Sequence, residues 1–252
     1  MHTSAKLNAQ RFFDNYAPFF PDGTVVVDLG SQDVNGSLRE VCPTRFRYTG
    51  IDFQAGKNVD VVMTDPYRVP LNDNSVDILI SSSTFEHSQM FWLLFLDVLR
   101  VLKPNGLFYL NVPSNGAFHR HPWDCWRFYP DSAMALVEWA KRNNLNPAAI
   151  ESWWSATSYD GHWNDHVSVF LKDVQYLSRY PSTMVYTKDQ SGQLQFKIET
   201  GGLANGIFHE FGPNTIIDMR DLPNGTNIDG TTTLKEDATQ YGKLATKYDK
   251  LK

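Results

Sequence analysis

The sequence predicts an α/β fold, and two observations carry this prediction. Four segments in the first third of the chain each run from apolar residues to a polar or acidic end, at Asp28, Asp52, Asp65 and Ser81. Segments with a helical pattern alternate with strand-like ones, which is typical of parallel strands joined by right-handed crossovers. In open α/β sheets the ligand crevice lies beyond the carboxyl ends of the strands. The four polar ends therefore indicate a nucleotide-like ligand.

Seven strands are expected in total, because short runs rich in Val, Ile and aromatic residues recur between Gly, Pro and Asn turns. They are predicted at 24–30, 45–53, 59–65, 75–83, 106–114, 148–157 and 166–173.

Four helices are expected between and before these strands, at 4–16, 38–41, 90–102 and 130–142. The first presents Phe12, Phe13 and Tyr16 loosely on one side and ends before Pro18. The third is apolar almost all round. It is predicted to stop at Pro104, which cannot continue a helix, before a tight turn at Asn105.

The character of the chain changes after Asp173. Short strands at 194–200 and 214–219 and a closing amphipathic helix at 233–251 are expected there. We therefore divide the chain into a domain at 1–173 that includes the N-terminal helix and a C-terminal extension at 174–252. The extension is expected to cap the substrate or to contact another subunit, so homo-oligomers are considered.

Composition excludes several classes of function. The net charge of −5 comes without a long basic run, so no nucleic-acid partner is expected. No apolar leader or run long enough to span a bilayer is present, so no membrane association is expected. The only cysteines, Cys42 and Cys125, lack the spacing of a metal site or a disulfide framework. A cytoplasmic location follows.

The predicted strand ends favour an adenosine over a dinucleotide. After Gly30 the chain continues with Ser31, Gln32 and Asp33 instead of the GxGxxG fingerprint, and this places a carboxylate where a pyrophosphate would lie. Asp52 follows Asp28 by 24 residues at the next strand end, where a carboxylate can accept hydrogen bonds from both ribose hydroxyls.

Five segments together resemble the class I S-adenosylmethionine-dependent methyltransferases, and specifically the type 11 methyltransferase domain, over about 24–173. They are VVVDLGS, GIDF, TDPYRVPLNDNSVD, SSSTFEHS and VLRVLKPNGLFYLNVP. The resemblance implies a Rossmann-like, mostly parallel seven-stranded sheet with helices on both faces, whose seventh strand is antiparallel. It also implies S-adenosylmethionine as cofactor, bound by Asp28, Gly30, Ser31, Asp52, Phe53, Asp65, Pro66, Ser81 and Ser82. In this set Asp28 and Gly30 hold the methionine part, Asp52 the ribose, Asp65 with Pro66 the adenine, and Ser81 or Ser82 lies near the sulfonium.

The loop that follows the fifth strand is the predicted substrate site, because it must emerge at the ligand edge of the sheet. His119 and His121 are candidate bases, indoles stack on sugars, and Arg127 can clamp an anion. His162 is a third candidate base, from the connection before the antiparallel strand. The candidate substrate-binding residues are Trp123, Trp126, Arg127 and Trp163. No metal is expected, because no third ligand accompanies His119 and His121 at a convincing spacing.

The predicted function is methyl transfer to an oxygen or nitrogen of a small molecule or glycan. A glycan acceptor is implied by the resemblance of the HPWDCWRF segment to relatives associated with polysaccharide biosynthesis. Two alternatives stay open: a non-catalytic interaction module of the same fold and a nucleotide-cofactor oxidoreductase. The simpler reading is that the acids cap turns, the tryptophans pack under the next helix and the histidines bond the backbone.

Overall fold

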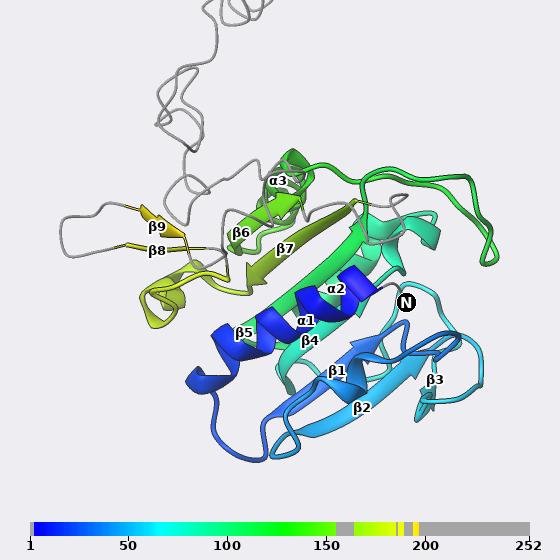
Figure 1. The fold of residues 1–252 in the computed structure, drawn as a ribbon, viewed down its shortest axis with the longest axis horizontal. Coiled ribbons are helices and arrows are strands. Elements are labelled where there is room, and N and C mark those ends of the chain that lie inside the picture. Colours follow the sequence, from blue (N-terminus) through cyan, green and yellow to red (C-terminus); the bar gives the residue numbers. More distant parts are fainter. Residues whose placement is uncertain (1–2, 155–163, 185, 189–193, 197–252) are drawn as a thin grey trace, which may run out of the picture.

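A seven-stranded sheet dominates the computed structural model, which describes residues 3–154, 164–184, 186–188 and 194–196 (Figure 1). Its strands are β1 (Val25–Leu29), β2 (Arg47–Asp52), β3 (Val61–Val62), β4 (Val76–Ser82), β5 (Leu102–Pro113), β6 (Ala148–Trp154) and β7 (Asp165–Leu171). They lie in the order β3-β2-β1-β4-β5-β7-β6, and β7 runs antiparallel to both of its neighbours. The predicted seven-stranded, mostly parallel sheet is confirmed.

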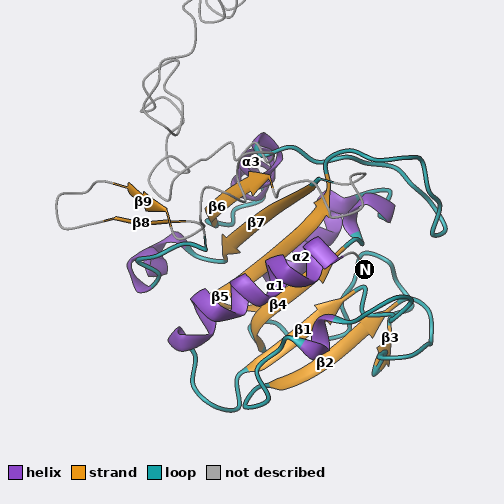
Figure 2. Ribbon diagram, viewed as in Figure 1, coloured by secondary structure: helices purple, strands orange, loops and turns teal. Residues whose placement is uncertain are grey.

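Helices cover both faces of this sheet, as Figure 2 shows. The α-helices are α1 (Thr3–Tyr16), α2 (Phe91–Val101) and α3 (Asp131–Arg142). Short 3-10 turns are η1 (Ala17–Phe19), η2 (Leu38–Glu40), η3 (Phe85–His87) and η4 (Val174–Arg179), and β8 (Tyr186–Lys188) pairs with β9 (Leu194–Phe196). The expected strand at 194–200 is thus present in part. The expected strand at 214–219 and the closing helix at 233–251 lie outside the described residues.

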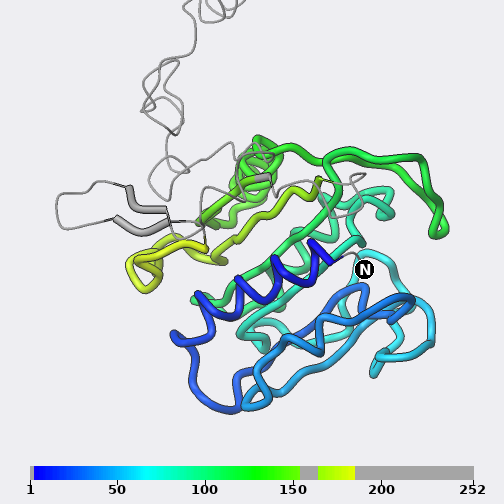
Figure 3. Tube along the Cα trace, viewed as in Figure 1, coloured from blue at the N-terminus to red at the C-terminus, as the bar shows by residue number. Residues whose placement is uncertain are grey.

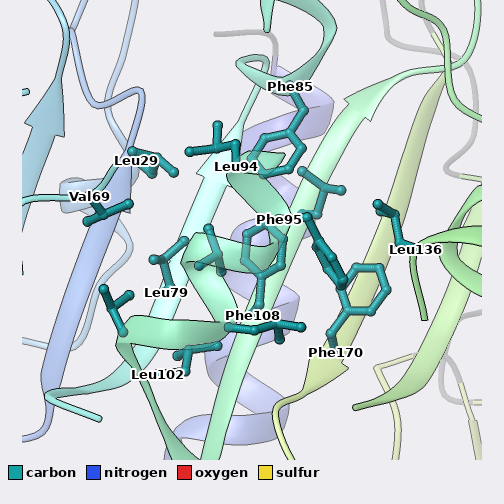
Figure 4. Close-up of a cluster of buried hydrophobic side chains, with 14 of the residues drawn as sticks. Leu29, Val69, Leu79, Phe85, Leu94, Phe95, Leu102, Phe108, Leu136 and Phe170 are labelled. Atoms are coloured by element: carbon teal, nitrogen blue, oxygen red, sulfur yellow. The ribbon is translucent and has the colours of Figure 1, made fainter. Parts of the chain in front are cut away.

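The pleat of the strands divides the core into two layers. Successive strand residues point to opposite faces, so Ile78 and Ile80 of β4 pack on the α1 side, whereas Leu79 packs on the α2 side. Figure 4 shows the layer under α2 and α3, where rings and branched side chains interlock. Its labelled members are Leu29, Val69, Leu79, Phe85, Leu94, Phe95, Leu102, Phe108, Leu136 and Phe170.

Helix α1 is fixed across the other face. Phe12 and Tyr16 are fully buried against the sheet. At its first turn Ser4 Oγ donates to Asp165 Oδ2 at 3.0 Å, and one turn later Asn8 Nδ2 donates to Asn111 Oδ1 at 3.1 Å. The amino end of α1 therefore lies beside the carboxyl end of β5 (Figure 1).

The sequence-based prediction was wrong about the length of the third strand and about the helix after the first strand. The third strand comprises only Val61 and Val62, because Asp60 turns its carboxylate to Gly50 N, at 2.7 Å, at this edge of the sheet. Instead of a helix after β1 there is only the η2 turn. Between β3 and β4 the prolines Pro66 and Pro70 exclude a regular helix.

The fifth strand begins earlier than expected. Leu102 follows α2 directly and pairs with Val76, and the next pair is Leu107 with Ile78, so the Pro-Asn-Gly segment forms a bulge inside the strand. Gly106 is required there, because a Cβ atom would lie 2.9 Å from the carbonyl oxygen of Asp77. The segment that we expected to separate helix from strand belongs to the strand.

The long loop between β5 and α3 reaches past the carboxyl ends of the strands and returns, as the tube in Figure 3 shows in green. The sheet thus brings its loops together at one edge.

The described helices include none with the length and apolar character needed to cross a bilayer.

Candidate functional site

A cavity of about 350 Å³ opens at the carboxyl ends of β1 and β2 and beside the loop that follows β4. Its size falls in the range of small-molecule and cofactor sites. Four segments that are distant in sequence form its wall: 28–38, 52–67, 82–94 and 121–123. Of the nine predicted cofactor residues, those that line it are Asp28, Gly30, Ser31, Asp52, Phe53, Pro66 and Ser82.

Asp28 lies at the base of this cavity. Its carboxylate is buried and accepts a hydrogen bond from the hydroxyl of Tyr48 on β2. Burial raises the pKa of Asp28 to about 7, against the opposing effect of the Tyr48 hydrogen bond. Asp28 can therefore hold a proton near neutral pH and donate it to a bound ligand.

Gly30 gives the turn after β1 its sharp form. Its φ is +85°, which favours glycine, and its N–H donates to Ile51 O at 2.8 Å. A Cβ atom at this position would lie 1.8 Å from Thr84 Oγ1. The turn therefore packs directly against the loop after β4, and any side chain at Gly30 would separate the two walls of the cavity.

In the loop after Gly30, the carboxylate of Asp33 is bound by other residues and does not line the cavity. Asp33 accepts a hydrogen bond from Gly36 N at 2.7 Å and pairs with Lys57 at 2.6 Å. The residues of this loop that line the cavity are instead Gln32, Val34, Asn35 and Gly36. Asp33, whose position in the sequence argued against a pyrophosphate ligand, therefore pairs with Lys57.

Asp52 ends β2 with a preoriented carboxylate. Its side chain is buried, Oδ2 accepts from Gln32 N at 3.1 Å and Oδ1 accepts from Gln54 N at 3.2 Å. Each carboxylate oxygen has a second lone pair. Asp52 can therefore accept two further hydrogen bonds from a pair of neighbouring hydroxyls, while Phe53 beside it lines the same wall.

The segment after β3 contributes through its apolar residues. Met63, Pro66 and Tyr67 line the cavity, whereas the exposed Asp65 does not and accepts a hydrogen bond from Tyr67 N at 2.8 Å. Asp65 thus caps the turn that places Pro66 and Tyr67, and the predicted contact to adenine stays a prediction.

The serines at the carboxyl end of β4 have two different roles. Ser81 is fully buried and its hydroxyl donates to Leu29 O at 2.7 Å, so it ties β4 to β1 beneath the cavity. Ser82, Ser83 and Thr84 line the wall instead. The strand pleat explains the shift, because neighbouring residues point to opposite sides.

The predicted substrate loop reaches the cavity at three residues, His121, Pro122 and Trp123. Trp123 is 49% exposed, so an indole face is accessible at the entrance. His119 lies next to His87 of η3, with ring centroids 5.0 Å apart. The loop and η3 are joined by a hydrogen bond from His87 Nδ1–H to Trp123 O.

Trp126 and Arg127 hold the loop together. Trp126 Nε1 donates to Ser88 O at 3.0 Å, and its ring packs on Phe91 and Trp92. The Arg127 guanidinium forms an ion pair with Asp124, with nitrogen–oxygen contacts of 2.5 and 2.9 Å. This pair holds the pKa of Asp124 at about 2. Arg127, which we predicted to bind an anionic group of the substrate, thus pairs with an aspartate of its own loop.

The candidate base His162 and the candidate substrate-binding Trp163 lie outside the described residues. His166, two residues into β7, is buried, and burial lowers its pKa to about 3 while Nε2 lies 2.5 Å from Ser168 Oγ. His166 is therefore a neutral core residue.

Sequence reasoning did not identify Gln32, Thr84 and the buried Glu86 as residues of the site. The FEH segment carried the available signal, because Glu86 follows Phe85 in a run that the fold buries. The partner of this segment in the β5–α3 loop is set by tertiary structure, which one sequence does not reveal.

A family model described as a methyltransferase domain matches residues 30–110, about a third of the 252 residues. A search of curated proteins found no match. Among solved structures, a 1,6-didemethyltoxoflavin-N1-methyltransferase of Burkholderia thailandensis with S-adenosylhomocysteine is 13% identical, with 67% of this chain and 78% of that chain covered and a TM-score of 0.49.

Two further similar structures are methyltransferases described as SAM-dependent. The one from Archaeoglobus fulgidus is 14% identical, covers 66% of this chain and 93% of its own, and has a TM-score of 0.49. The one from Aquifex aeolicus is 15% identical, with 66% and 98% covered and a TM-score of 0.42. None of these likenesses is close enough to assign a substrate. The match over residues 30–110, which include β2, β3, β4 and most of β5, shows that this part of the chain is similar to a methyltransferase domain.

Proposed function

We propose that this chain transfers the methyl group of S-adenosylmethionine to an oxygen or nitrogen of a small molecule or glycan. The observation that carries the proposal is the position of Asp52: a buried carboxylate at the end of β2, held by two backbone N–H groups on the wall of the cavity. We assign it to the ribose hydroxyls. In the same proposal Asp28, Gly30 and Ser31 hold the methionine part, and Phe53, Pro66 and Tyr67 enclose the adenine.

The sulfonium supplies an electrophilic methyl group, and the protein must align the acceptor and take its proton. We assign the acceptor to the part of the cavity wall formed by His121 and Trp123, because both come from the loop after β5 and line the cavity. His121 is the proposed base for a hydroxyl acceptor. The exposed indole of Trp123 is suited to the apolar face of a sugar ring, which supports the glycan class.

The remaining expectations belong to the same proposal. Both cysteines are free thiols, and burial raises the pKa of Cys42 to about 12, so it is unreactive. This supports a reducing, cytoplasmic setting. We keep the division at 173 as a proposal, with 174–252 as a cap or subunit contact.

The test is a transfer assay with methyl-labelled S-adenosylmethionine across sugars, nucleotide sugars and small amines. We expect label on a sugar hydroxyl, and a loss of kcat of about 10² to 10⁴ in His121→Ala with a smaller change in KM. Phe118→Ala, in the same loop but outside the cavity wall, is the matched control. Transfer only to amines would overturn the glycan assignment, and no transfer in any class would overturn the function.

A further inference from the structure

Three potential metal ligands meet beside the cavity. Glu86 and His87 belong to η3 after β4, and His119 comes from the loop after β5. One ligand atom of each lies within 4.8 Å of the others. The fold thus supplies the third ligand that the sequence spacing of His119 and His121 lacked.

Glu86 is an unusual member of this cluster. It is 1% exposed, and its Oε2 has no hydrogen-bond partner among the described residues. Leaving a buried carboxylate oxygen unpaired is costly, so such an atom calls for a cation, a proton or a ligand. The other carboxylate oxygen, Oε1, lies 3.7 Å from His87 Nε2.

Both histidines are oriented as metal ligands usually are. A ligating histidine typically donates one ring N–H to a carbonyl or carboxylate and binds the ion through the other nitrogen. His87 Nδ1 faces Trp123 O, and a carbonyl only accepts, so Nδ1 carries the proton. His119 Nδ1 likewise lies 3.2 Å from Ala117 O and 3.5 Å from Asp124 Oδ2. Both residues thus have Nε2 as the ligating nitrogen.

We propose that Glu86, His87 and His119 bind a divalent cation of the zinc class. Two imidazoles and one carboxylate form a donor set that catalytic zinc sites use, with one position open. Tetrahedral ligands at zinc lie roughly 3.3 Å apart. Atoms at the 4.8 Å limit would need to close by roughly 1.5 Å, which the partly exposed His119 can provide by rotating its side chain.

The site adjoins the cavity, because His87 is also part of its wall. An open coordination position on this side would face the acceptor. If the proposed methyl transfer holds, a cation here would lower the pKa of an acceptor hydroxyl and so favour oxygen over nitrogen acceptors. Binding of the cation itself does not depend on that function.

The test is a titration of chelator-treated, full-length protein with Co²⁺ and with Zn²⁺, read by the visible absorption of Co²⁺ and by calorimetry. We expect one equivalent of Co²⁺ with the intense bands of a four- or five-coordinate site. His119→Ala and Glu86→Gln should each weaken binding by about a hundredfold or more, given that outer partners alone are worth about 10- to 100-fold. Thermal unfolding checks that each variant folds.

Two control variants separate this ligand set from its neighbours. Cys125→Ser removes the exposed thiol nearest in sequence, and His121→Ala removes the other histidine of the loop; both should bind Co²⁺ as the wild type does. Loss of binding in either control, with His119→Ala unaffected, would overturn the assignment. Absence of stoichiometric Co²⁺ and Zn²⁺ binding by the wild type would overturn the site altogether.

Discussion

Two buried glutamates, one on β6 and one in η3, have opposite surroundings. Glu151 on β6 is 0% exposed; it accepts from the Tyr16 hydroxyl, from Trp153 Nε1 at 3.1 Å and from Met184 N at 3.1 Å. Glu86 is 1% exposed, and its Oε2 has no partner in the described parts of the chain. Burial raises the pKa of Glu86 to about 8. Burial of a carboxylate therefore does not by itself indicate function, whereas an unsatisfied oxygen does.

The largest effect expected from this comparison is on stability. Glu151→Ala removes the acceptor of the Tyr16 hydroxyl and of two N–H groups in the core. We expect the free energy of unfolding to fall by about 3 to 5 kcal/mol. Urea denaturation followed by circular dichroism measures it. A loss below about 1 kcal/mol would mean that the network around Glu151 does not anchor α1 to β6.

A third buried carboxylate, Asp28, has one partner and faces the cavity. Its folded-state pKa is raised to about 7, so the folded chain holds a proton that the unfolded chain releases above its own, ordinary pKa. Its contribution to stability is therefore present at low pH and is lost as the pH rises through 7. Asp28→Asn should gain about 1 to 3 kcal/mol of stability relative to the wild type between pH 5 and pH 8.

The measurement compares wild type and Asp28→Asn by urea denaturation at the two pH values. The difference between the proteins isolates Asp28 from other groups. His166 acts in the opposite direction, because its lowered pKa makes the folded state lose stability as the pH falls from its ordinary value toward 3. A constant difference between the two proteins would contradict the raised pKa.

The comparison extends to two acids at strand ends, one buried and one exposed. Asp52→Ala removes two charge-assisted acceptors from the cavity, so we expect affinity for S-adenosylhomocysteine to fall about ten- to a hundredfold. Asp65→Ala is the matched control, and we expect less than about a threefold change because Asp65 only caps an exposed turn. Equal losses in both variants would place the adenine at Asp65 after all.

The smallest effect expected is again on stability. Glu86→Gln keeps the shape of the side chain and replaces a carboxyl oxygen, Oε2, that has no partner among the described residues, so the free energy of unfolding should change by no more than about 0.5 kcal/mol or rise. Glu151→Gln, measured alongside, should lose about 1 to 3 kcal/mol because its amide nitrogen cannot accept. A larger loss at Glu86 than at Glu151 would reverse the comparison.

Much of the sheet could be predicted from the sequence, because β1, β2 and β4 are apolar runs that end in polar residues. Features that depend on neighbouring strands could not. The two-residue β3 follows from Asp60 turning to Gly50, and the bulge at Gly106 follows from the register of β5 on β4. Neither the short β3 nor the bulge at Gly106 can be predicted from local composition.

Residues at strand ends that line the cavity could be found from the sequence more easily than those in the loop after β5, for the same reason. Asp28, Gly30 and Asp52 sit at strand ends, where position alone determines which way they face. Arg127, by contrast, looked like a ligand clamp until its pairing with Asp124 was visible. The meeting of Glu86 with His119 joins segments 33 residues apart, and no spacing rule indicates it.

Calorimetric titration of the wild-type protein with S-adenosylhomocysteine, with NAD as the negative control, is the most direct test of the cavity as a methyl-donor site. We predict one binding site per chain with a dissociation constant in the micromolar range, roughly −8 kcal/mol, and no heat from NAD. Binding of NAD, or no binding of S-adenosylhomocysteine and S-adenosylmethionine, would contradict the account.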